Sequence, residues 1–211
     1  MALSKVKAIS ICICITTLLI TVTQNALAEK SDFAKAADLI REDQYVAAFT
    51  IFESLAEKND HDAQFNTAVL LRKGIGHPAN YPKALKWAWL AELGGNLRAI
   101  ELREELIVLI PEDQIELVRQ QVKDLLERRM VDGESLVILQ MANFYLNVVA
   151  EPDYKQAYAL RSLAAALNIK NAASLRDDIE PELDPEELIE AQAIAGEMFS
   201  ITEWITAVPT D

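Results

Sequence analysis

The side chains best suited to chemistry in this chain are its two histidines, His61 and His77. His61 lies in a turn-forming segment, residues 59–62 (Asn-Asp-His-Asp), and His77 follows a Gly-x-Gly sequence and precedes a proline. An imidazole in such a place can act as an acid–base group or a metal ligand. Neither histidine has a second histidine or a cysteine at a zinc-binding spacing, however. We therefore expect both to be turn residues, and we predict no metal site.

Other catalytic arrangements are also missing from the sequence. It contains no Gly-x-Ser-x-Gly nucleophile elbow. Gly74-Ile75-Gly76 follows no predicted strand and has no phosphate-binding lysine in frame, which favours a helix-ending turn over a phosphate loop. Both cysteines, Cys12 and Cys14, lie close to the N-terminus. We expect no catalytic residue, no cofactor and no enzymatic activity.

Acidic side chains are densest between Asp177 and Glu190, where eight Asp or Glu residues occur. Residues 182–186 (Glu-x-Asp-x-Glu) place three of them at alternating positions. A calcium loop needs such alternating oxygens together with a tight glycine turn, and this segment has no glycine. Weak calcium binding remains one alternative. We favour a solvated acidic face or a docking patch for a basic partner.

The elements that would position these side chains are all predicted to be helices. No segment alternates between apolar and polar residues at period two, so we expect no sheet. The break at Asp132-Gly133 separates a long amphipathic helix from the next hairpin. The expected helices span about 31–41, 44–58, 62–73, 81–93, 97–109, 111–130, 134–147, 154–167, 171–179 and 184–200.

The helices recur at fixed intervals along the chain. A shift of 36 residues aligns Tyr45 with Tyr81, and a shift of 73 aligns Ala84 with Ala157. Two short helices joined by a glycine turn cannot bury their own apolar faces, so copies must stack. The sequence thus predicts a clear repeat at residues 63–99 and a degenerate copy at 136–172.

The clear repeat resembles the Sel-one-like repeat (SLR), a relative of the tetratricopeptide repeat. The resemblance implies an all-α fold, an α/α superhelix of stacked antiparallel helical hairpins in a tetratricopeptide-like solenoid. In the degenerate copy Asn147 and Val149 replace the two glycines of the turn. Because valine resists a positive φ, we expect a turn of another shape there. The positions that match the family's pattern are Gly74, Gly76, Lys83, Ala84, Trp87, Gly95, Asn96 and Ala99.

Candidate partner-binding residues follow from this architecture. In stacked hairpins the first helix of each pair commonly lines the inner curve. That position is shared by Gln64, Thr67, Leu71, Gln140 and Phe144. Trp87 matches a core position of the family, whereas Trp89 lies about 200° further around the helix and is either packed or presented for binding. The structural set is Gly74, Gly76, Ala84, Trp87, Gly95 and Ala99.

Residues 1–28 have the features of a secretory signal peptide. Lys5 and Lys7 precede an apolar run at Ala8–Val22, and Ala26-Leu27-Ala28 is a small-x-small cleavage site. An uncleaved membrane anchor is the alternative, although the run is short of the about 20 residues that a spanning helix needs. We expect no later membrane span, a repeat domain at 29–203 and a flexible tail at 204–211.

Charge and composition narrow the function. The net charge is −13, and removal of two lysines with the signal makes it −15, so nucleic acid is an unsuitable partner. A cysteine-free exported chain suits a bacterial periplasm better than a eukaryotic secretory route. We expect a non-catalytic envelope protein that binds another protein as scaffold, adaptor or regulator, and a basic surface on that partner would suit the charge of this chain. The alternatives are an enzyme accessory or hydrolase-like activity, or a structural part of a motility or secretion apparatus.

Overall fold

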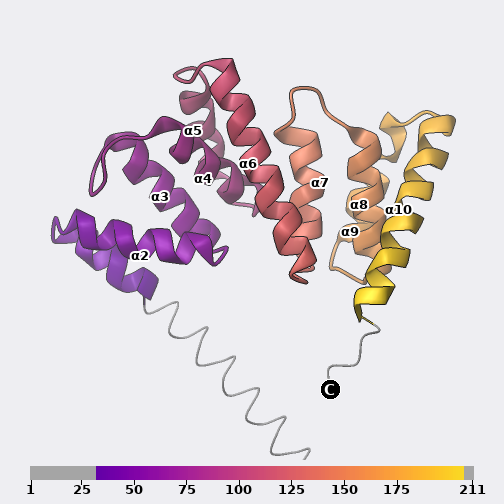
Figure 1. Cartoon of the computed structure of the whole chain (residues 1–211), viewed down its shortest axis with the longest axis horizontal. Helices are drawn as coiled ribbons and strands as arrows, with labels where there is room; N and C mark the ends of the chain where they lie inside the picture. The colour runs from indigo at the N-terminus through magenta and orange to yellow at the C-terminus, as the bar shows by residue number, and fades with distance from the viewer. Residues whose placement is uncertain (1–31, 207–211) are drawn as a thin grey trace, which may run out of the picture. The chain divides into compact units, whose positions relative to one another are not determined.

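The computed structural model describes residues 32–206, and the side chains among them as far as residue 201. No strand occurs in that range, so the predicted all-α fold of helical hairpins is confirmed there. The expected signal peptide at 1–28 and residues 207–211 lie outside the described residues. Figure 1 shows the helices in chain order.

Capping aspartates mark the start of two of the helices. Asp60 precedes α3 and its side chain accepts from the Ala63 backbone N–H at 2.8 Å, and Asp153 caps α8 in the same way at 2.9 Å. A helix over 32–41 comes first. It is followed by α2 (Tyr45–Glu57), α3 (His61–Lys73), α4 (Tyr81–Leu93), α5 (Arg98–Ile107), α6 (Glu112–Val131), α7 (Val137–Asn147), α8 (Tyr154–Ala166), α9 (Ala172–Ile179), the 3-10 turn η1 (Glu180–Glu182) and α10 (Pro185–Thr206).

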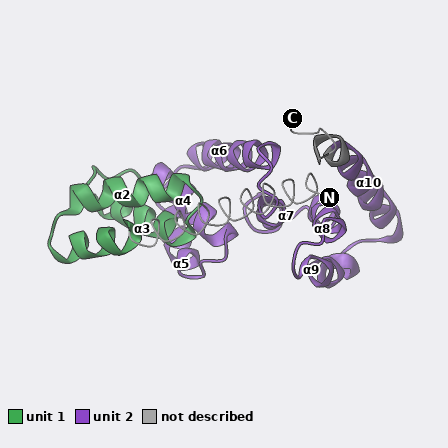
Figure 2. Ribbon diagram, turned by 90° about the horizontal axis from the view of Figure 1, so that it is seen from below, with its two compact units in different colours: residues 1–80 green, residues 81–211 purple. Residues whose placement is uncertain are grey.

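The contacts divide the chain into two compact units, residues 1–80 and 81–211, which Figure 2 colours separately. In the described part of the first unit, α2 packs against α3. Phe33 of the 32–41 helix meets Phe52 of α2 edge to face, with ring centroids 5.3 Å apart. The division between the units falls inside the predicted repeat at 63–99.

In the second unit the helices pack around two central ones. The first of two central helices, α4, packs against α5, α6 and α7, and the second, α8, packs against α7, α9 and α10. Most of their side chains are buried, including Trp87 of α4 and Leu160 of α8. A helix buried to this extent needs apolar side chains over most of its surface, and its neighbours cover them. The last helix continues to Thr206, beyond its expected end near residue 200 and into the segment expected to form a flexible tail.

The glycine turn after α3 depends on the absence of a side chain. Gly74 caps α3 with φ 67°, and its N–H donates to the Leu70 carbonyl. Gly76 has φ 75°, and a Cβ built on it would lie 2.3 Å from the Tyr45 carbonyl oxygen. Gly76 therefore combines a left-handed conformation with close backbone approach.

The degenerate copy ends its first helix, α7, without a glycine. Val148, which caps α7, has φ −112°, so this turn has a different shape, as predicted. Asn168, which aligns with Gly95 in the first copy, keeps a positive φ of 56°. Asparagine tolerates that conformation better than other residues with a Cβ.

These geometries predict unequal costs for alanine at the two glycines of the turn. Both Gly74→Ala and Gly76→Ala impose a positive φ on alanine, which costs about 1–2 kcal/mol. Gly76→Ala also drives a Cβ into backbone, whereas the nearest atom to a Cβ at Gly74 is the Ala79 nitrogen at 3.3 Å. We expect Gly76→Ala to lower the free energy of unfolding by roughly 1–3 kcal/mol more than Gly74→Ala. Urea unfolding of the two variants measures the difference, and equal midpoints would contradict it.

Candidate binding surface

The structure buries all six residues that the sequence proposed as partner contacts. None is exposed by more than 6%: Gln64, Thr67, Leu71, Trp89, Gln140 and Phe144. The interpretation that they are presented to a partner is therefore wrong. The side of a first helix that was expected to line an open curve is covered here, since α3 packs against α2, and α7 against α6 and α8.

The buried polar members of this set hold turns and helices together. The Gln64 side-chain amide donates to the Ala56 carbonyl and to Asn59 Oδ1, both at 3.2 Å. Its own oxygen lies 3.0 Å from His61 Nδ1. Thr67 Oγ1 donates to the Ala63 carbonyl at 2.8 Å. Gln64 thus ties the α2–α3 turn together, and His61, which was expected in the turn, is the first residue of α3 and contacts Gln64.

His77 also has structural contacts. Its ring packs on Phe49 with centroids 4.9 Å apart, and its Nδ1 lies 2.7 Å from the Pro78 carbonyl oxygen. Among residues 32–206, no three His, Cys, Asp or Glu side chains lie close enough together to hold a metal ion. The calcium alternative at 182–186 therefore has no ligand cluster in the described part of the chain.

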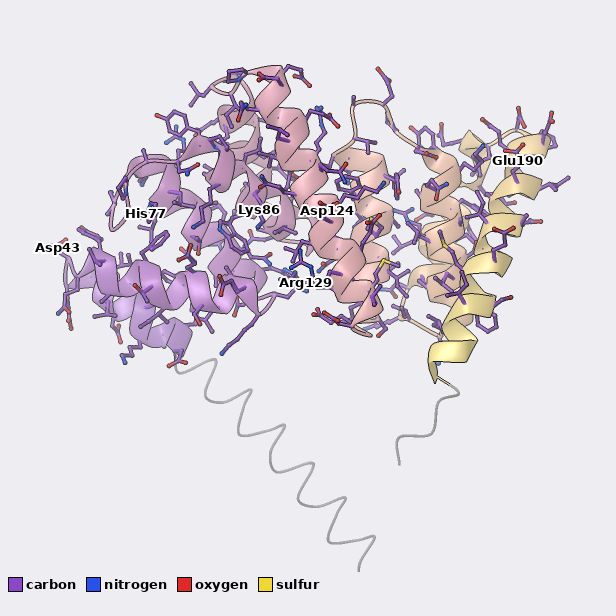
Figure 3. All side chains as sticks on the ribbon, in the orientation of Figure 1. Asp43, His77, Lys86, Asp124, Arg129 and Glu190 are labelled. Atoms are coloured by element: carbon purple, nitrogen blue, oxygen red, sulfur yellow. The ribbon has the colours of Figure 1, made fainter. Side chains whose placement is uncertain are left out.

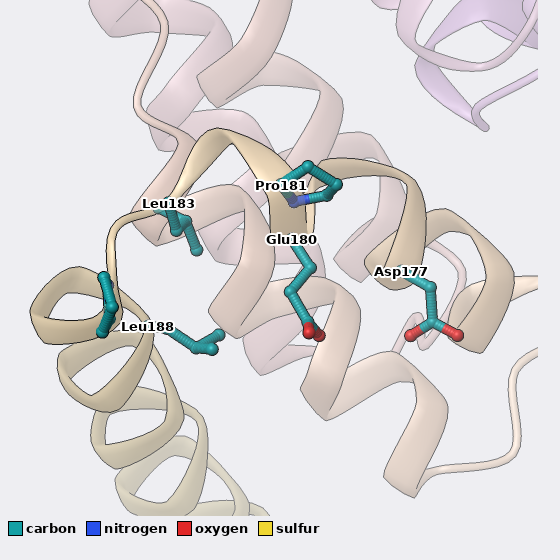
Figure 4. A pocket seen from close by; sticks show the side chains of 6 residues that line it. Asp177, Glu180, Pro181, Leu183 and Leu188 are labelled. Carbon is teal, nitrogen blue, oxygen red and sulfur yellow. The ribbon is translucent and has the colours of Figure 1, made fainter.

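A solvent-open hollow does occur where the chain passes from α9 through η1 into α10 (Figure 4). Its volume is about 540 Å³. We call it the acidic corner. The residues that line it are Asp177, Glu180, Pro181, Leu183, Pro185 and Leu188.

The backbone of the acidic corner is fixed by two prolines and a capping box. Pro181 lies in η1, and Leu183 is extended with φ −103° and ψ 136°. Asp184 Oδ1 then accepts from the backbone N–H groups of residues 186 and 187, both at 2.9 Å, while Glu187 Oε2 accepts from the Asp184 N–H at 3.0 Å. Pro185 opens α10, where its missing N–H costs nothing. The chain therefore turns sharply here with little freedom.

Apolar contacts anchor the inner wall of the acidic corner. Leu183 and Leu188 are partly buried and pack on a core cluster that contains Tyr158 of α8 and Ile179 of α9. The remaining exposed portions of these leucines face the hollow, as Figure 4 shows. A leucine that is half covered by its own core retains apolar surface for a ligand.

The segment from residue 177 onward carries only negatively charged side chains. Residues 177–211 contain eleven Asp or Glu and no Lys, Arg or His. Two basic side chains from earlier in the chain form ion pairs with carboxylates of this segment. Arg176 Nη2 lies 2.5 Å from Asp177 Oδ1. Lys155 Nζ lies 2.7 Å from Oε2 of Glu190 on α10, and Figure 3 labels Glu190 on that helix. The hydrogen bond to Asp177 raises the pKa of Arg176, and the one to Glu190 raises the pKa of Lys155. Among the described residues, the ion pairs of this segment involve only Asp177 and Glu190, and its other carboxylates form none.

A buried arginine positions α9 beside the acidic corner. Arg161 of α8 is 7% exposed, and burial lowers its pKa. Its Nη1 donates to the Leu175 carbonyl of α9 at 2.5 Å, and its Nη2 donates to Asn143 Oδ1 of α7 at 3.3 Å. One guanidinium thus links three helices. Sequence reasoning missed this residue because only the pairing of helices reveals its role.

A second hollow of about 240 Å³ lies on the α6–α7 side of the same unit. Arg119 of α6 lines this hollow. Its Nε donates to the Val148 carbonyl at 2.9 Å, and its Nη1 donates to Glu112 and Glu116 at 2.9 Å each. Burial opposes the charge of Arg119, but the bonds to Glu116 and Glu112 raise its pKa overall. Arg119 thereby caps the C-terminus of α7, where the degenerate copy lacks its glycine turn.

Comparison with known proteins gives a likeness among solved structures but none at the level of sequence families. The sequence matches no family model, and no curated protein matches it. A solved structure to which the chain is similar is c5321, a protective antigen present in uropathogenic Escherichia coli strains that displays an SLR fold. It is 18% identical with a TM-score of 0.38, and the match covers 87% of this chain and 34% of that one. This chain therefore spans about a third of the length of that protein. Separately, none of the helices in the described range is long and apolar enough to cross a membrane.

The three-helix link predicts a strong effect of Arg161→Met. The variant keeps an unbranched apolar side chain but removes the hydrogen bonds that the buried Arg161 guanidinium donates to α9 and α7. We expect unfolding free energy to fall by about 1–3 kcal/mol and amide exchange in α9 to accelerate. Arg176→Met on α9 is the control, because its exposed ion pair is worth about 0–1 kcal/mol. Equal stability of the two variants would contradict the assigned role.

Proposed function

We propose that this chain is an exported, non-catalytic helical-repeat protein that binds another protein in the bacterial envelope, as a scaffold, adaptor or regulator. The observation that carries the proposal is the acidic corner, a hollow of about 540 Å³ with apolar walls and carboxylates beside them. Protein-binding sites commonly combine a buried apolar contact with a polar rim in this way.

The surroundings of the acidic corner favour a protein over other ligands. Its walls are leucine and proline side chains, which suit an apolar side chain of a partner. The net charge of −13 opposes contact with nucleic acid or with anionic lipid. A basic protein surface would instead be attracted, and its approach would be steered by the long-range field of the chain.

Export is supported by the N-terminal sequence. Lys5 and Lys7, the apolar run at Ala8–Val22 and the Ala26-x-Ala28 site follow one another in the order of a signal peptide. The two cysteines of the chain lie in this segment, so the exported part would carry no thiol. A disulfide-forming compartment would then leave it unchanged.

The first test concerns export and cleavage of the signal peptide. We expect cleavage after Ala28, so mass spectrometry of the exported protein should find Glu29 at its N-terminus. Retention of Met1 in a membrane fraction would contradict both cleavage and release.

The second test concerns binding. Protein captured from an envelope extract with the purified chain should contain a specific partner. Its association rate should fall as salt rises, because the Debye length shortens from about 10 Å at 0.1 M to about 3 Å at 1 M. A chain that retains no partner above the level of an unrelated acidic protein would contradict the proposed function. An association rate that is independent of salt would contradict the steering.

A further inference from the structure

We propose that the acidic corner binds a short basic and apolar segment of a partner protein, with a Lys or Arg side chain against Asp177 and Glu180 and an apolar side chain against Leu183 and Leu188. This inference rests on the proposed function, because it names the class of partner that the same surface takes. It goes further in naming the chemistry of the partner segment and the residues that each part of it contacts.

The apolar half of the contact follows from how the two leucines are placed. Leu183 lies on the extended link after η1, and Leu188 lies in the first turn of α10. Each packs one side on the core cluster around Tyr158 and Ile179 and leaves the other side in the hollow. Pro181 and Pro185 frame them, so little conformational entropy is lost when a ligand is bound.

The charged half follows from the two carboxylates. Glu180 accepts from the Tyr158 hydroxyl at 3.3 Å, which holds its side chain toward the hollow. Asp177 is oriented by Arg176, which contacts Oδ1 at 2.5 Å through Nη2 and at 2.9 Å through Nε. Figure 4 shows both carboxylates directed to the same side of the turn. A carboxylate held in place in this way can accept hydrogen bonds from a cation at little ordering cost.

The charge around the acidic corner decides between possible occupants. From Asp177 to the C-terminus the chain has eleven acids and no base, so an acidic or neutral apolar peptide would bring no charge compensation. A second copy of this chain would bring the same acidic segment and be repelled. A partner segment that is both basic and apolar places a cation against the carboxylates and covers the exposed surface of the leucines.

The test uses a synthetic amphipathic peptide made of Lys, Leu and Ala, with fluorescence anisotropy as the readout of binding to the purified protein. We expect binding, with amide chemical-shift changes centred on residues 177–188. Asp177→Asn/Glu180→Gln should weaken affinity by roughly three- to tenfold, as expected for two solvent-accessible charge contacts. The control Asp132→Asn/Glu101→Gln makes the same charge change at exposed positions outside the acidic corner and should leave affinity unchanged.

The apolar contact is tested with a matched pair of leucines. Leu183→Ala should weaken binding of the peptide. Leu146→Ala removes the same atoms from a residue that packs on the same core cluster but does not line the hollow, so it should not. Thermal unfolding of both variants shows whether each is folded at the assay temperature, and the charge variants provide an independent readout if Leu183→Ala is not.

Several outcomes would overturn the inference. They are no binding of the peptide, equal loss in the acidic-corner and control variants, or chemical-shift changes located elsewhere. Equally tight binding of a Lys–Ala peptide without leucine, or of spermine, would mean that the acidic corner attracts any cation by charge alone. That result would also overturn the inference. The proposed function fails separately, if no protein partner is captured. A captured partner that binds the Asp177→Asn/Glu180→Gln variant as tightly as the unaltered chain would contradict the inference alone.

Discussion

The C-terminal unit is organised by the need to cover α4 and α8 on every side. The two helices occupy equivalent places in the 73-residue duplication, and alanines at matching positions, Ala84 with Ala157 and Ala91 with Ala164, are fully buried. Small residues let neighbouring helices approach closely, and dense packing follows. A helix that buries most of its side chains cannot end a stack, so other helices must follow it. For α8 these are α9 and α10, which pack on it after α7.

The acidic corner follows from this covering of α8. The chain leaves α8, forms the short helix α9 and must reverse before α10 can lie against α8. Pro181 and Pro185 produce that reversal within a few residues, and the Asp184 capping box starts the new helix. The hollow is thus the inside of an obligatory turn. Its leucines belong to the core, and its carboxylates lie at the ends of helices, so one piece of chain provides both parts of a binding surface.

Arg161 shows how the two copies diverged. It takes the place of Ala88 in the first copy, where the equivalent position in α4 is fully buried. A buried arginine without a carboxylate in direct contact is costly, and burial lowers its pKa. The carbonyl of Leu175 and the amide oxygen of Asn143 compensate for part of that cost. The degenerate copy has therefore replaced close packing by a polar link, and the same link holds the wall of the acidic corner.

Local features of this fold could be predicted from sequence, whereas its surfaces could not. The ends of α3 and α4 were predicted within one residue, because Asp60, Gly74 and the apolar period mark them locally. Asn168 aligns with Gly95 across the 73-residue shift, and it has a positive φ. The burial of Gln64 and Phe144 depends on which helices cover α3 and α7, and helical period alone does not determine that. The acidic segment was recognised by composition, but the hollow within it arises from the η1 turn, whose shape depends on packing against α8.

The central claim is that a partner protein contacts the acidic corner. Hydrogen–deuterium exchange of the chain, alone and with its captured partner, tests it without any substitution. Protection on binding should be concentrated in residues 177–190, with the α2–α3 turn around Asp60 unchanged. Protection confined to the first unit, or absent from 177–190 while the partner is bound, would contradict the claim.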